Sequence, residues 1–299
     1  TLGFRKAFKV TNGNQTSGAG ADDFIYFNAQ AIEAQNLAKS GWNYVSSSSN
    51  ITLSFWVKSS VAQNFYFQFD VRDGTRYSYA METGSLTADT WTKVTKTIPG
   101  NSNLTIDNDN EVGAYITFGL FWGTNLTGSV SLNTWGVASD SAKTPDYTST
   151  WYTTNDATFE ITGVQLEVGS VATDFEHRSF AQELRLCSRY YQQWALITSG
   201  SSNDNAVAVL ANFSSTAAYG RIPFINGPMR TGPSITHSNN AYFTNGASYS
   251  GLTYTVSGAS STSLEVSVTA SSGNWTGGDA GWLRAQTGSG GQFALNAEI

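Results

Sequence analysis

The strongest constraint on how this chain can fold is a strict alternation of side-chain types in two neighbouring stretches, 52–59 and 65–72. Every second residue there is a leucine, phenylalanine or valine, and the residues between are mostly polar or amphipathic. A period of two predicts strands with one face in a core and the other toward water. The apolar positions are Leu53, Phe55, Val57, Phe65, Phe67, Phe69 and Val71.

Short strand-like segments separated by Gly, Asn and Pro loops continue through the rest of the 299 residues. Only 13% of the residues are charged, and hydroxyl-bearing residues are abundant, which suits strands and turns better than helices. The length predicts two domains. We therefore expect an all-β chain, with a jelly-roll β-sandwich over 1–176, a connecting helix and strand over 177–198, and a smaller β domain over 199–299.

The centre of the sequence holds the most individual local signals. In Phe159–Val168 the apolar parity changes at Gly163, which predicts a one-residue bulge in a strand. Ser179 and Gln182 have the spacing of a capping box and predict the start of a short helix. Its apolar stripe is expected to dock against the fold, with the single cysteine buried and inert on it. The stripe consists of Phe180, Leu184 and Cys187.

The same central region, with the sequences VQLEVGS at 164–170 and ATDFE at 172–176 and then Arg189, Tyr190 and Tyr191, resembles a phage tail-protein pattern. Weaker matches at 53–59, 88–93 and 228–230 occur in the same order. In that family the pattern joins a jelly roll similar to carbohydrate-binding modules to a small C-terminal β domain. The resemblance implies a tail fibre or spike protein, located on the virion and commonly homotrimeric.

A glycan-binding face is predicted beside the alternating strands. Asp73-Gly74 is a favoured two-residue hairpin turn, and its register would place Tyr77 next to Asp70 and Tyr79 next to Gln68 on the wet face. Exposed rings stack on sugars, and amides or carboxylates bond their hydroxyls. The alternative is that loops or another subunit cover this face and the rings are packing. The candidate residues are Trp56, Tyr66, Gln68, Asp70, Tyr77 and Tyr79.

Other function classes receive little support from the sequence. A net charge of −6 and a pI near 4.9 argue against nucleic-acid binding, and no apolar run of membrane-spanning length is present. No nucleophile elbow, phosphate-binding loop or zinc-ligand spacing of His177 or His237 is visible, so we expect neither an enzyme nor a cofactor. The acidic loop 107–111 favours a solvated turn, with calcium as the alternative. Its acids are Asp107, Asp109 and Glu111.

The sequence and the resemblance together favour a non-catalytic virion appendage that binds a host-surface glycan and contacts other virion proteins. The alternatives are a structural baseplate or capsid-decorating protein and, third, a glycan depolymerase. The C-terminal part has few large apolar residues between Tyr254 and Gly281, which suggests assembly with copies of itself into the homotrimer that the resemblance implies. The rings expected near those contacts are Trp194, Phe213, Trp275 and Trp282.

Overall fold

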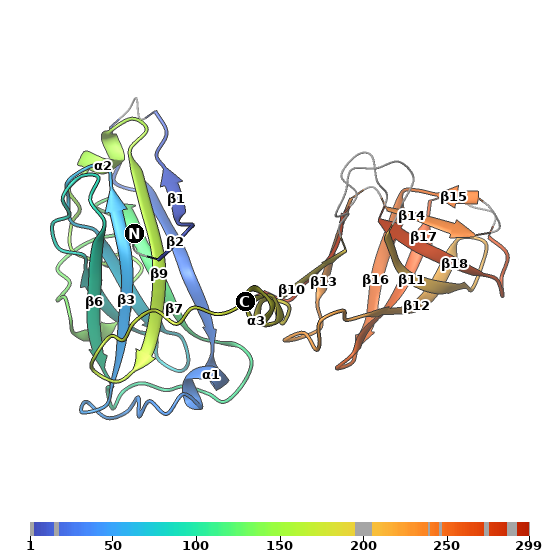
Figure 1. Ribbon diagram of the computed structural model, residues 1–299, viewed down its shortest axis with the longest axis horizontal. Helices are drawn as coiled ribbons and strands as arrows, with labels where there is room; N and C mark the ends of the chain where they lie inside the picture. Colours follow the sequence, from blue (N-terminus) through green and yellow to red (C-terminus); the bar gives the residue numbers. More distant parts are fainter. Residues whose placement is uncertain are drawn as a thin grey trace. The chain divides into compact units, whose positions relative to one another are not determined.

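The computed structural model describes residues 3–14, 18–194, 205–238, 240–244, 247–271, 275–285 and 292–298. The chain divides into two compact units, Thr1–Glu176 and His177–Ile299. In the described residues both units are built on antiparallel sheets (Figure 1), so the predicted all-β class is confirmed. The division falls where the sequence placed its first boundary. The segment predicted as a connection, 177–198, belongs to the second unit, and its residues 195–198 lie outside the described ones.

The first unit is a sandwich of a four-stranded and a five-stranded sheet. The four-stranded sheet has the order β1 (Phe8–Thr11), β9 (Thr158–Val168), β3 (Asn50–Ser59), β6 (Thr92–Pro99). The five-stranded sheet has the order β2 (Phe24–Glu33), β7 (Val112–Trp122), β4 (Tyr66–Val71), β5 (Tyr77–Glu82), β8 (Trp135–Val137). Two short helices, α1 (Ala34–Ala38) and α2 (Thr150–Thr153), bury Leu37 and Trp151.

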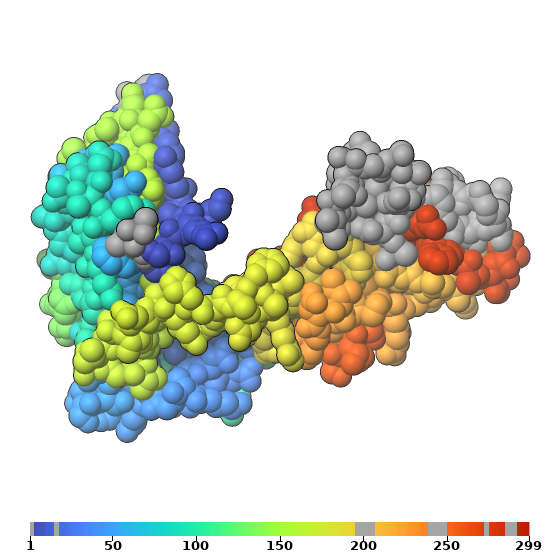
Figure 2. All heavy atoms as spheres, viewed as in Figure 1, coloured from blue at the N-terminus to red at the C-terminus, as the bar shows by residue number. Residues whose placement is uncertain are grey.

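The core of this unit lies between the two sheets, and it contains all seven apolar residues predicted from the alternation. Side chains fill the space between the ribbons (Figure 2). Phe55 comes from the four-stranded sheet and meets Phe67 and Phe118 of the five-stranded sheet, with ring centroids 5.1 and 4.9 Å away. The two strands with the clearest pattern therefore sit in opposite layers, and their apolar faces meet.

The bulge predicted at Gly163 is present. The pairing of β3 with β9 shifts register between Ser54 and Trp56, and Gly163 has a φ of +62°. Glycine adopts this conformation at no steric cost, and a Cβ here would clash with the Phe4 ring. The backbone conformation thus favours glycine at this position, and the close approach of Phe4 requires it.

The second unit combines a three-stranded and a seven-stranded sheet. The three-stranded order is β10 (Tyr191–Trp194), β19 (Gln292–Asn296), β13 (Ser234–Ser238). The seven-stranded order is β15 (Ala247–Tyr249), β14 (Asn240–Thr244), β18 (Ala280–Ala285), β11 (Asn205–Asn212), β12 (Ala217–Pro223), β17 (Ser263–Ala270), β16 (Leu252–Ala259). A separate core of mainly aliphatic residues, including Leu264, Val266 and Val268, lies within this unit.

Helix α3 (Phe180–Cys187) begins with the predicted capping box. The Ser179 hydroxyl accepts from the Gln182 amide, and the Gln182 side chain accepts from the Ser179 amide. The predicted docking is wrong, because Phe180, Leu184 and Cys187 are all exposed and the helix buries no residue. The spacing of apolar residues defines a stripe on a helix, but it does not supply the surface that would cover the stripe.

Because α3 buries no side chain, its stability depends strongly on its cap. Ser179→Ala is expected to weaken the helix by about 1 kcal/mol, equivalent to roughly fivefold faster exchange of the amides in its first turn. Leu184→Ala, which trims an exposed side chain, should change exchange far less. Hydrogen exchange followed by mass spectrometry measures both variants. Equal protection in Ser179→Ala and the native chain would contradict the cap.

Candidate functional site

The hairpin of β4 and β5, which carries five of the six candidate residues, has a different register from the predicted one. Val71 pairs with Tyr77 and Phe69 with Tyr79, so both tyrosines lie on the core side of the sheet. Tyr79 is buried against the Trp135 ring, with centroids 5.2 Å apart. The reason lies in the turn. A two-residue type I′ turn needs positive φ at both central residues, but here Gly74 alone has it and the connection runs from residue 72 to 76.

The Asp73 carboxylate stabilises this longer turn by accepting from the Asp107 amide at 2.9 Å. Burial raises the pKa of Asp73 above its usual range, opposed by that hydrogen bond. Thr105 lies beside Gly74. Contacts from a loop far along the chain therefore help to select the register, and Tyr77 and Tyr79 leave the predicted wet face.

Trp56 also lies away from the other candidates. It belongs to β3 of the four-stranded sheet, where it pairs with Lys93 and Thr162 on the outer face. Tyr66, Gln68 and Asp70 belong to β4 of the five-stranded sheet, on its outer face. The two outer faces point to opposite sides of the sandwich, so one ligand ring cannot contact Trp56 and the β4 residues together. The predicted grouping of all six residues on one face is wrong.

Gln68 and Asp70 do lie on the outer face, but they are only 7% and 5% exposed. Gln68 donates through Nε2 to the backbone carbonyl of Lys143 at 2.5 Å. Asp70 accepts from Arg76 Nε at 3.0 and 3.2 Å and from Arg72 Nη1 at 3.0 Å. Both side chains are thus engaged within the protein. In this part of the face, the structure therefore agrees with the alternative interpretation, in which a loop covers the predicted binding residues.

The covering loop is held by a second set of charges. Asp140 accepts from Lys143 Nζ at 2.6 Å and from Arg76 Nη1 at 3.0 Å. The Lys143 ammonium and the Arg76 guanidinium lower the pKa of Asp140 to about 2. Asp140 therefore stays ionised at neutral pH. Arg76 joins Asp70 in the sheet to Asp140 in the loop.

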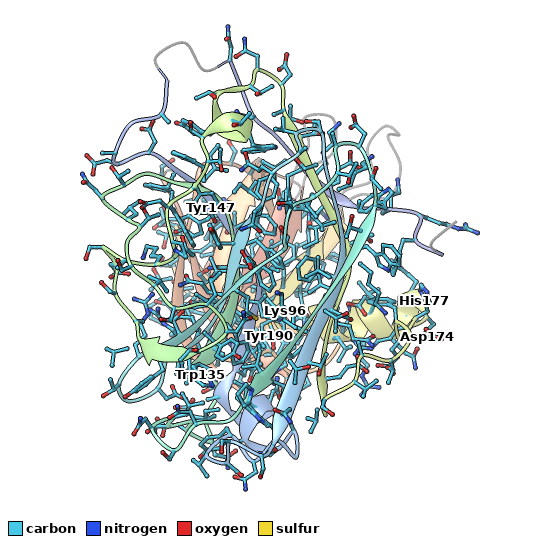
Figure 3. The ribbon with its side chains drawn as sticks, turned by 90° about the vertical axis from the view of Figure 1, so that its left-hand side faces the viewer. Lys96, Trp135, Tyr147, Asp174, His177 and Tyr190 are labelled. Atoms are coloured by element: carbon cyan, nitrogen blue, oxygen red, sulfur yellow. The ribbon has the colours of Figure 1, made fainter. Side chains whose placement is uncertain are left out.

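Farther along the same face, Tyr147 anchors the loop above Gly119. Its hydroxyl donates to the Gly119 carbonyl at 2.9 Å and accepts from the Tyr66 amide at 3.2 Å. A Cβ on Gly119 would lie 2.6 Å from that hydroxyl oxygen and 2.8 Å from the Trp122 ring. Burial raises the pKa of Tyr147 well above its usual range. Figure 3 shows Tyr147 toward one end of the sandwich and Trp135 toward the other.

A row of five aromatic rings crosses the outer face at the Tyr147 end, and we call it the aromatic ledge. Successive centroids are 5.7, 6.2, 6.2 and 4.9 Å apart. Trp122 is buried, whereas Phe24 and Tyr26 are 56% and 50% exposed. The ledge therefore has a packed inner part and an open end on the edge strand β2. In order along the row, its members are Phe24, Tyr26, Trp122, Tyr147 and Tyr66.

Polar side chains lie beside the open end of the ledge. Asn28 pairs with Thr117, one step along β2 and β7, and the Thr117 hydroxyl donates to the Asn28 amide oxygen at 2.8 Å. This bond orients the exposed amide and leaves its NH₂ group as a donor. Exposed rings next to an oriented amide are the combination expected to bind a sugar. Of the predicted site residues, Tyr66 alone belongs to the ledge, and it lies at the inner end of the row.

Phe24 and Tyr26 were not predicted as site residues, although the sequence contains their signal. Residues 24–30 alternate between large or polar outer side chains and inner Ile25, Phe27 and Ala29. The turn-rich residues 11–20 and the apolar residues that follow predict a strand over 23–27 only, which is too short to show that the alternation extends to Gln30. Extending the strand by one period would have placed Tyr26 and Asn28 on the same outer face.

The acidic loop provides no metal site in the part of the chain that the structure describes. Asp107 donates its amide to Asp73, and the Asp109 carboxylate accepts from the Glu111 amide at 3.0 Å. No cluster of three or more His, Cys, Asp or Glu side chains suited to a metal ion occurs among the described residues. In the same residues, none of the helices has the length and apolar character needed to cross a bilayer.

Comparisons with known proteins leave the family open. No protein-family model and no curated protein matches this sequence. Among solved structures, a crystal structure of cucumber necrosis virus aligns over 98% of this chain and 87% of its own, with 11% identity and a TM-score of 0.18. A TM-score this low does not establish a shared fold.

Proposed function

We propose that this chain is a non-catalytic virion appendage protein, a tail fibre or spike, that binds a host-surface glycan at the open end of the aromatic ledge. The observation that carries the binding proposal is the pair of half-exposed rings, Phe24 and Tyr26, beside the oriented Asn28 amide. Sugar rings present C–H faces that stack on such aromatics, and their hydroxyls accept from amides. The virion role and the association with other virion proteins come from the sequence resemblance.

The ledge is suited to binding because its inner part is immobilised. Tyr26 and Tyr66 flank Gly119 on neighbouring strands, and Tyr147 is hydrogen-bonded above that glycine. A platform held by a sheet loses little conformational entropy when a ligand binds. The site therefore needs no rearrangement of the backbone to present Phe24 and Tyr26.

Immobilised host polysaccharide distinguishes the proposed function from its rivals. Retention of the intact chain without shortening of the polysaccharide supports the glycan-binding appendage. Lack of retention across a broad set of host glycans favours a structural baseplate or capsid-decorating role. Release of oligosaccharide would show a depolymerase and overturn the non-catalytic assignment.

Tyr26→Ala is expected to weaken glycan binding by about 1–2 kcal/mol, because stacking area is lost. Since the ring is half-exposed, the melting temperature should change little. Trp56→Ala removes an aromatic ring from the outer face of the opposite sheet and is the matched control, expected to bind like the native chain. Titration calorimetry measures both. An equal loss of glycan affinity in the two variants would contradict the assignment of the glycan site to the aromatic ledge.

A further inference from the structure

The seven-stranded sheet of the second unit has an apolar strip on the face opposite its core. β11 is the middle strand of this sheet, between β18 and β12. Val209 pairs with Trp282, and Ala211 pairs with both Ala280 and Tyr219. Cross-strand partners share a face, so these side chains form one continuous surface. We define the apolar strip as Val209, Ala211, Phe213, Tyr219, Ala280 and Trp282.

The strip is exposed although the sheet has a complete core on its other side. Val209, Phe213 and Trp282 are 57%, 76% and 49% exposed. Leu210, Ala218 and Leu283, which alternate with strip residues along the same three strands, are buried. An antiparallel sheet with one solvated face normally carries polar side chains there. β17 and β16 follow that rule, since Ser267 and Thr255 lie opposite each other on this face.

We infer that the apolar strip is the surface through which copies of this chain associate. The three rings, each roughly half-exposed or more, and the aliphatic side chains between them amount to an apolar area on the order of 400 Å². Exposed apolar patches of this size commonly mark interaction sites. A standard interface buries about 800 Å² on each partner. The strip would supply the apolar centre of such an interface, and the polar residues of β17 and β16, such as Ser267 and Thr255, would supply its rim.

The charges around the strip favour a second copy as the occupant. The chain has a net charge of −6, yet no carboxylate belongs to the strip. Its neighbouring acid, Glu265, is paired with Arg221 at 3.2 Å, and the Arg284 guanidinium lies 5.3 Å from the Trp282 ring centre. Two identical acidic chains can therefore meet here with the Glu265 carboxylate of each already paired to its own Arg221. Two strips can meet face to face, or three around an axis, and either arrangement buries the rings.

A saccharide fits the strip less well than an identical strip does. The alanines and the valine between the rings offer no side-chain group to bond sugar hydroxyls, in contrast to Asn28 and Thr117 beside the aromatic ledge. The strip also lies in a different unit from the ledge. Self-association and glycan binding are therefore separable by mutation.

Light scattering of the full chain tests the inference. The native chain should show a whole-number multiple of 32.1 kDa at micromolar concentration. Val209→Glu introduces a charge at the centre of the strip and should weaken association by at least about thirtyfold, giving the single-chain mass. Thr255→Glu places the same charge on the polar flank of the same face and should retain the native mass.

Phe213→Ser serves as a second variant, because this highly exposed side chain can be removed without disturbing the core. An unchanged far-ultraviolet circular-dichroism spectrum verifies the fold of each variant. A native chain that scatters as a monomer would overturn the inference. The inference would also be overturned if both Val209→Glu and Phe213→Ser kept the native mass. It would be overturned as well if these variants kept the native mass but no longer bound the polysaccharide.

Discussion

Replacing Phe118 by alanine is expected to destabilise the N-terminal sandwich by about 3–5 kcal/mol. Phe118 is 1% exposed and lies between the layers. It stacks with Phe27 and Phe67, with centroids 5.4 and 5.3 Å away, and meets Phe55 edge-on at 4.9 Å. The truncation removes a whole ring from a packed cluster, and the neighbouring rings are too rigid to fill the cavity.

Denaturant unfolding measures this effect, and hydrogen exchange assigns it to a unit. The transition of Thr1–Glu176 should move while that of His177–Ile299 stays, because each unit has a core of its own. Phe24→Ala is the matched control, since it removes the same ring from the exposed end of the neighbouring strand β2, and it should cost under about 1 kcal/mol. Similar losses in the two variants would contradict the assignment of Phe118 to the core and Phe24 to the surface.

The same contrast explains how much of the fold was predictable. A side chain's inward or outward direction follows from its place in the alternation, so Phe55 and Phe67 were assigned correctly from sequence. The bulge at Gly163 and the cap at Ser179 are also local, because each depends on a few adjacent residues. Local geometry of this kind is encoded within the segment that adopts it.

The candidate site was harder to predict because it depends on distant contacts. Trp56 and Tyr66 are on consecutive strands, but the chain crosses from one sheet to the other between them. Asp70 is covered by a loop that begins about seventy residues later in the chain. Arg76 connects the two, because it donates to Asp70 in the sheet and to Asp140 in the loop. The alternation cannot show which sheet a strand joins or which loop covers it. It indicated a polar face correctly but not which part of that face is open.

In the C-terminal unit, four aromatic rings were expected near the contacts between copies of the chain. Phe213 and Trp282 do lie on an exposed face. Trp275 is buried, and the partly buried Trp194 packs on Phe293 of the core with centroids 5.8 Å apart, so both rings contact their own unit's core. The expected shortage of large apolar groups is met by aliphatic packing from Leu264, Val266 and Val268. The unit therefore closes a core without a partner chain.

Phe293→Ala should consequently destabilise the C-terminal unit by about 3–5 kcal/mol, even in dilute solution where copies are dissociated. Phe293 is fully buried on β19, the middle strand of the three-stranded sheet, and its ring contacts Trp194 and Tyr254. Its loss removes the ring that joins β10 to β16 across this core. Ile225→Ala, which shortens an exposed side chain of the same unit, is the control and should cost under about 1 kcal/mol.

Comparing Phe293→Ala with Val209→Glu separates folding from association. If the unit folds alone, Phe293→Ala lowers its melting temperature at every protein concentration, whereas Val209→Glu lowers the mass with little effect on melting of the dilute chain. If the unit instead required its copies in order to fold, Val209→Glu would melt as early as Phe293→Ala. That outcome would show that the aliphatic core on the inner face of the seven-stranded sheet is insufficient, and that the apolar strip on its outer face completes the fold.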